Sequence, residues 1–119
     1  MLRFMQQHRG IGLAAPQIGL DLRMFVMAIY ATPYFCFNPR IVQITGDLVE
    51  THEACLSFSG KTCKIKRYDR IIAGWQKFNG EYEEKELVGL PAICFQHELD
   101  HLDGITMLDR EKEQSAKQS

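Results

Sequence analysis

The sequence predicts an α+β fold in which antiparallel β-sheets pack around one buried helix. Residues 23–88 contain short strand-like segments separated by turn signals. Residues 90–102 instead carry apolar and histidine side chains with helical spacing. The chain has 119 residues, of which 45% are hydrophobic, so one core of ordinary size is expected. Strands first and a helix late are typical of an α+β domain.

Composition and charge exclude several classes of protein. Fourteen basic and fifteen acidic residues leave a net charge of −1, so neither nucleic acid nor a membrane is an expected partner. The uncharged stretch over residues 24–39 is interrupted by Pro33 and is shorter than the about 20 residues of a membrane span. Residues 1–10 are too polar for a signal peptide, so we expect a cytoplasmic protein with free thiols.

The N-terminal segments give the weakest structural signals. Residues 1–8 resemble the last turns of a helix, because Leu2 and Met5 are three positions apart. Residues 10–16 are too rich in glycine and small side chains for an ordinary helix or strand. We therefore expect an irregular segment there, in which glycine allows a close approach of a ligand.

A buried strand is predicted over residues 23–30, which are almost entirely apolar. Residues 35–37 and 41–44 are predicted as two further strands, separated by Pro39 because proline cannot donate a hydrogen bond to a sheet.

Short edge strands are expected over residues 47–50 and 63–67. Residues 70–78 and 81–88 form the clearest local prediction, a β-hairpin. Asn-Gly at 79–80 predicts a two-residue turn with positive φ at both positions. The second arm is rich in charge, as is typical of a water-facing edge strand.

The helix over residues 90–102 has signals at both ends, since Pro91 fits a first turn and Gly104 follows the last. One face is expected to be buried at its apolar end, and it carries Leu90, Ile93, Cys94, His97 and His101. Residues 111–119 are polar without periodicity and are expected to be frayed.

Residues 97–101 read HELDH, an HExxH motif. On a helix, residues at i and i+4 lie one above the other, so His97 and His101 can bind one metal ion with Glu98 beside it as a base. A catalytic site usually needs a third protein ligand. The downstream ligands of HExxH peptidases are absent here, because Met107 stands where one pattern has histidine and later glutamates lie in the polar tail. The upstream candidates are Cys36, Cys55, Cys63, Cys94, His8, His52 and Glu53.

Three motifs in this order resemble those of the peptide deformylases, which read GxGLAAxQ, EGCLS and QHExDH. The chain has GIGLAAPQ at residues 10–17, EACLS at 53–57 and QHELDH at 96–101. The resemblance covers about residues 1–110, the expected catalytic domain, with a polar tail over 111–119.

The resemblance implies a metal-dependent hydrolase that removes the N-formyl group from the N-terminal methionine of new peptides. It implies Cys55, His97 and His101 as metal ligands and Glu98 as general acid and base. The Gln17 side chain and the Leu56 N–H are implied as oxyanion donors. The residues implied or expected at the substrate are Ile11, Gly12, Ala54, Leu90, Ile93 and Cys94.

The implied metal is Fe²⁺, with Zn²⁺, Ni²⁺ or Co²⁺ as substitutes, since thiolate and imidazole suit these ions better than Mg²⁺ or Ca²⁺. The implied partners are N-formylmethionyl peptides, including nascent chains at the ribosome.

Two features depart from the family pattern. Ala54 replaces the glycine of the second motif, and only nine residues precede the first motif, where the family has a strand and most of a helix. The alternatives are an inactive or weakly active deformylase fragment, a zinc peptidase and a metal-stabilised binding module.

Overall fold

The computed structural model describes residues 12–14, 23–29, 32–53, 63–105, 110 and 114. These residues form β1 (Gly12–Ala14), β2 (Met24–Ile29), β3 (Thr32–Ile44), β4 (Leu48–Glu53), β5 (Cys63–Tyr68), β6 (Arg70–Gln76), β7 (Tyr82–Val88) and α2 (Leu90–Leu102).

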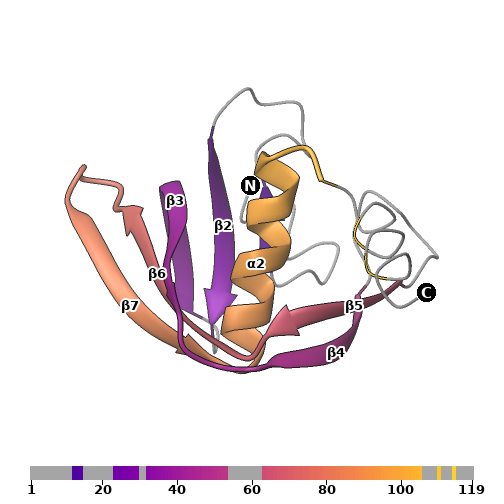
Figure 1. Ribbon diagram of the computed structural model, residues 1–119. Coiled ribbons are helices and arrows are strands. Elements are labelled where there is room, and N and C mark those ends of the chain that lie inside the picture. The colour runs from indigo at the N-terminus through magenta and orange to yellow at the C-terminus, as the bar shows by residue number, and fades with distance from the viewer. Residues whose placement is uncertain are drawn as a thin grey trace.

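Two antiparallel sheets contain these strands. The larger has the order β1-β2-β3-β6-β7, and the smaller pairs β4 with β5. Figure 1 shows α2 beside the larger sheet and the β4–β5 ribbon extending away from that sheet. The helix packs on β1 and β2 and also contacts β5. The predicted α+β class, with antiparallel sheets and a helix packed against them, is confirmed.

The main core lies between α2 and the larger sheet. Phe95 of the helix meets Phe25 of β2 edge to face, with ring centroids 5.1 Å apart, and lies 6.0 Å from Trp75 of β6. All three side chains are fully or almost fully buried. Aromatic contacts of this kind add to the free energy gained by burying apolar area, so they fix the helix against the sheet.

The prediction of two strands broken by Pro39 is wrong, because β3 runs unbroken from Thr32 to Ile44. Its register with β6 shifts between Phe37 and Arg40, and Asn38 has a φ of 48°. The Asn38 N–H donates to the Arg23 carbonyl, in register with the pairing of Met24 and Phe37 between β2 and β3, so the irregularity is confined to the β6 side of the strand. Pro39 therefore lies in a β-bulge, where a missing N–H costs no sheet hydrogen bond.

The structure also differs from the expectations for residues 10–16 and for the hairpin turn. Gly12–Ala14 form strand β1, although residues 10–16 were expected to be irregular, because their backbone pairs with Phe25–Met27 of β2.

The hairpin is confirmed, but its turn is longer than two residues. The Gly80 N–H donates to the Lys77 carbonyl, and Gly80 has a φ of 88° whereas Asn79 does not have positive φ. This is a three-residue loop with glycine in the left-handed position.

Helix α2 has the predicted bounds, and its C-terminus is closed by a Schellman motif. The Ile105 N–H donates to the Asp100 carbonyl, and the Gly104 N–H donates to the His101 carbonyl. Gly104 has a φ of 74°, which glycine adopts without steric cost. No helix in the described part of the chain is long and apolar enough to cross a membrane.

Candidate metal centre

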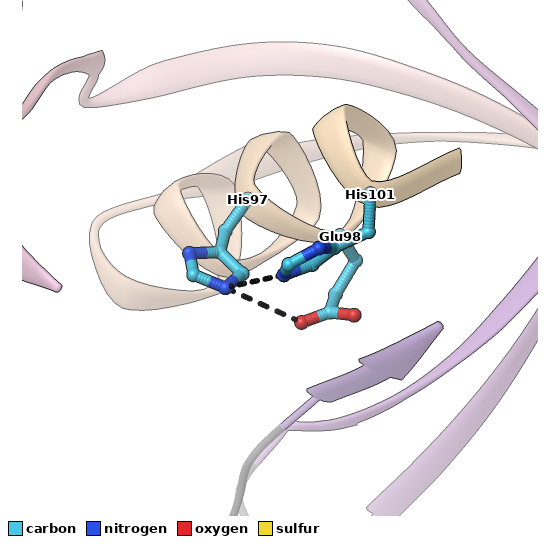
Figure 2. A group of neighbouring side chains, drawn as sticks. All are labelled: His97, Glu98 and His101. Carbon is cyan, nitrogen blue, oxygen red and sulfur yellow. Dashed lines mark hydrogen bonds and ion pairs between the residues drawn. The ribbon is translucent and has the colours of Figure 1, made fainter. Parts of the chain in front are cut away.

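His97 and His101 converge on one point from successive turns of α2. Their Nε2 atoms lie 3.0 Å apart, and the ring centroids are separated by 4.8 Å (Figure 2). The prediction from the i, i+4 spacing is confirmed in its geometry. An unbroken helix places the two imidazoles on one side, as that spacing requires.

Glu98 points toward the same place. Its Oε1 atom lies 3.9 Å from His97 Nε2, and its side chain is only 3% exposed (Figure 2). One ligand atom each from His97, Glu98 and His101 gives a group within 4.8 Å. A carboxylate held next to two imidazoles and shielded from water is the arrangement that a general base beside a metal needs.

The donor set fits a divalent transition metal. Two imidazole nitrogens at about 2.0–2.1 Å from one tetrahedral ion would be roughly 3.3 Å apart, close to the separation of the two Nε2 atoms in α2. Neutral imidazole suits Zn²⁺, Fe²⁺, Ni²⁺ and Co²⁺. The two histidines could therefore supply two corners of a tetrahedral site, which would need further ligands.

The candidates left open for the third ligand lie in different surroundings. Cys36 and Cys94 are buried, and both belong to the hydrophobic core. The His52 side chain is 61% exposed, and its Nε2 atom lies 3.7 Å from Glu50 Oε1. Within the described residues, none of these three joins the group formed by His97, Glu98 and His101. Cys55 and His8 lie outside the described residues, as do the side chains of Cys63 and Glu53.

The helix residues expected at the substrate are not uniformly buried. Cys94 is buried as predicted, Ile93 is half-buried, and Leu90 is 62% exposed. The expected burial of Leu90 is wrong, because the buried side of α2 is centred on Ala92 and Phe95 instead. The remaining positions fall differently: the Gly12 backbone belongs to β1, and Ile11, Gln17, Ala54 and Leu56 lie outside the described residues.

Two polar residues of α2 have contacts that the sequence analysis did not anticipate. Gln96 is buried and pairs with the backbone of Tyr68 in β5. Asp100 is buried between the guanidinium groups of Arg67 and Arg110. Both belong to QHELDH but are neither histidine nor the base. The available signal was the presence of polar residues next to the expected metal ligands, on a helix that was itself expected to be buried.

The polar tail also departs from expectation at one position. Gln114 lies within the segment expected to be frayed, yet its side chain is bonded to Lys66 of β5 by two hydrogen bonds. The partner backbone is 48 residues away in sequence, so no local pattern could reveal this contact.

Comparison with known proteins gives a consistent result. The family model of polypeptide deformylase matches residues 1–117. A peptide deformylase of Thermotoga neapolitana is 41% identical over 112 residues, which cover 94% of this chain and 68% of that protein. The corresponding enzyme of Thermotoga maritima is 43% identical over 110 residues, which cover 92% and 67%. The chain thus spans about two thirds of the length of these relatives.

Solved structures agree in fold. The crystal structure of the Thermotoga maritima peptide deformylase superposes with a TM-score of 0.89 at 43% identity, covering 92% of this chain and 75% of that one. A peptide deformylase from Synechococcus elongatus, crystallised with actinonin, also gives 0.89 at 37% identity, covering 93% of this chain and 61% of that one.

Proposed function

This chain belongs to the polypeptide deformylase family. We propose that His97 and His101 are two of its metal ligands and that Glu98 is the general base beside them. The family reaction is metal-dependent hydrolysis that removes the N-formyl group from nascent peptides. This assignment of residues is supported by the convergence of the two Nε2 atoms beside the buried Glu98 carboxylate.

Cys55 is the proposed third ligand. It occupies the cysteine position of the second family motif, in the segment that joins β4 to β5. Strand β5, which follows this segment, contacts α2, and β4, which precedes it, is paired with β5. Cys36 and Cys94 are worse candidates because the side chain of each packs within the hydrophobic core.

When bound, a divalent ion supplies a nucleophile at neutral pH by lowering the pKa of its water toward about 7. Glu98 accepts the proton of the attacking water and later delivers it to the departing amine, which leaves as the free N-terminus of the peptide. The Gln17 amide and the Leu56 N–H donate to the formyl oxygen as negative charge develops there. Removing one such donor typically costs about 3 kcal/mol of transition-state stabilisation.

The methionine side chain of the substrate is proposed to pack on the N-terminal part of α2. Leu90 and Ile93 retain exposed apolar surface, which a bound side chain would cover, and Cys94 lies behind them. Ile11 and Ala54 would complete this pocket. Gly12 belongs to β1, one of the two edge strands of the larger sheet in the described part of the chain, and we propose that the peptide backbone of the substrate approaches there.

Metal identity and cellular context are part of the same proposal. Fe²⁺ is the proposed native ion, with Zn²⁺, Ni²⁺ or Co²⁺ as substitutes, because one thiolate and two imidazoles favour these ions. Free thiols call for a reducing compartment, so we propose a cytoplasmic enzyme that meets its substrates as they emerge from the ribosome.

Product analysis tests this function. Anaerobically prepared, iron-loaded protein is incubated with a formyl-Met peptide, and the products are identified by mass spectrometry. We expect formate and the intact peptide with a free amine, whereas a peptidase would release shorter fragments. The Glu98→Gln variant is the control for contaminating activity. Fragments, or a wild-type rate no higher than that of this variant, would contradict the proposal.

A further inference from the structure

Two glutamine side chains occupy the edge of β5 that faces away from β4. Gln96 Oε1 accepts from the Tyr68 N–H at 2.9 Å, and Gln96 Nε2 donates to the Tyr68 carbonyl at 2.7 Å. Gln114 pairs in the same way with Lys66, which lies two residues before Tyr68 in β5. It accepts from the Lys66 N–H at 2.8 Å and donates to the Lys66 carbonyl at 3.1 Å. Each amide thus replaces one residue of a missing neighbouring strand.

Only one of these glutamines belongs to the metal helix. Gln96 immediately precedes His97, so its side chain leaves α2 about 100° around the axis from that imidazole. Its Nε2 atom also donates to the Ala92 carbonyl at 3.0 Å, one helical turn earlier. The amide is 6% exposed and is therefore held at three points. Rotation of α2 about its own axis would break the pairing with Tyr68.

Packing alone leaves this side of the helix incompletely filled. A hollow of about 510 Å³ lies there, with Gln96, Asp100, Tyr68 and Gln114 among its lining residues. Next to the hollow, buried Asp100 accepts from Arg67 of β5 and from Arg110 at 2.8 Å. Directed polar contacts therefore hold α2 to β5 in addition to the packing of Tyr68 and Leu99 against the core.

We propose that Gln96 is a positioning residue that fixes the rotation of α2, and so sets the direction in which His97 and His101 present their Nε2 atoms. This inference rests on the proposed function, because it concerns the same metal centre. Groups behind metal ligands typically change metal affinity or activity 10–100-fold when removed.

Gln96→Met and Gln114→Met make a matched pair, since methionine keeps most of the side-chain volume and each change removes two hydrogen bonds from β5. We expect Gln96→Met to weaken Co²⁺ affinity about 10–100-fold and to shift the visible Co²⁺ absorption bands. It should also lower kcat more than it raises KM. Gln114→Met should leave the affinity within about twofold, the bands unchanged and kcat unaltered, although its Tm falls.

Gln96→Glu keeps the acceptor for the Tyr68 N–H but sets a carboxylate oxygen against the Tyr68 and Ala92 carbonyls, so its affinity should fall at least as far as that of Gln96→Met. It decides the question by the same criterion if Gln96→Met does not fold. Wild-type affinity and bands in both Gln96 variants, or equal weakening by Gln114→Met, would overturn the positioning role. Failure of the wild-type chain to bind Co²⁺ or to release formate would instead contradict the proposed function.

Discussion

Cys36 lies in the hydrophobic core, where burial raises the pKa of its thiol to about 12, with the charge of Glu83 adding to the shift. A thiol with so high a pKa is protonated at neutral pH. Because the thiolate is the form that binds metals and reacts with electrophiles, Cys36 behaves as a small apolar side chain. The core environment thus separates this cysteine from any metal chemistry.

Alkylation of the native protein tests this assignment. At pH 8 we expect Cys36 to remain unmodified by iodoacetamide, as measured by peptide mass spectrometry, and to react after unfolding. The raised pKa also favours the folded state below the ordinary thiol pKa of 9.0, and this stabilisation is lost as the pH rises toward about 12. Native labelling as fast as in the unfolded chain would disprove the burial argument.

Glu98 is 3% exposed, and its Oε1 atom lies 3.9 Å from His97 Nε2. As the proposed general base, it is expected to move a proton and not to be needed for metal binding. We expect Glu98→Gln to lower kcat by at least about 100-fold, the usual contribution of a general base. Metal content, measured by atomic absorption, should stay at the wild-type level. A variant that turns over at more than a hundredth of the wild-type rate would show that another group moves the proton.

At the scale of elements, the sequence was informative where local rules decide the structure. The bounds of α2 follow from Pro91 and Gly104, and the convergence of His97 and His101 follows from helical spacing. Strand β3 was predicted wrongly because its continuity past Pro39 depends on a bulge against β6, which is a tertiary feature. The role of Gln96 was missed for the same reason, since its partner Tyr68 is 28 residues away.

The C-terminus of α2 gives a prediction at this scale. An alanine at Gly104 would meet no atom within 4 Å, so its cost comes from the positive φ alone. We expect Gly104→Ala to lower the free energy of unfolding by about 1–2 kcal/mol in urea denaturation. Gly104→Asn should lose less, because asparagine tolerates this conformation better. Equal losses for both variants would show that something other than φ sets the cost.

At the scale of the whole molecule, two ion pairs tie the region around α2 to strands distant in sequence, and they differ in burial. Arg67 of β5 pairs with Asp100 inside the protein, where both side chains are at most 10% exposed. Arg23, just before β2, pairs with Asp103 at the surface, with both side chains nearly half exposed. Solvent screens the second pair and not the first, so only the first should contribute strongly to the assembly of α2 with the smaller sheet.

Arg67→Met and Arg23→Met compare the two pairs directly. Arg67→Met should lower the free energy of unfolding by about 2 kcal/mol, because it removes a charged hydrogen bond from a buried carboxylate that keeps Arg110 as its second partner. Arg23→Met should cost less than about 1 kcal/mol, and less still at high salt. Urea denaturation at two ionic strengths measures both values. Similar losses in the two variants would mean that burial does not govern these contacts.

We propose that one metal ion, held by His97, His101 and Cys55, is sufficient for deformylation by this chain. Stepwise addition of Ni²⁺ to the metal-free protein tests it most directly, with formate release from a formyl-Met peptide measured at each step. We expect the rate to rise linearly and to stop rising at one Ni²⁺ per chain. With Cys55→Ser, saturation should need a large excess of Ni²⁺. Formate release that is independent of Ni²⁺, or that saturates equally in wild type and Cys55→Ser, would show that Cys55 does not hold a catalytic metal ion.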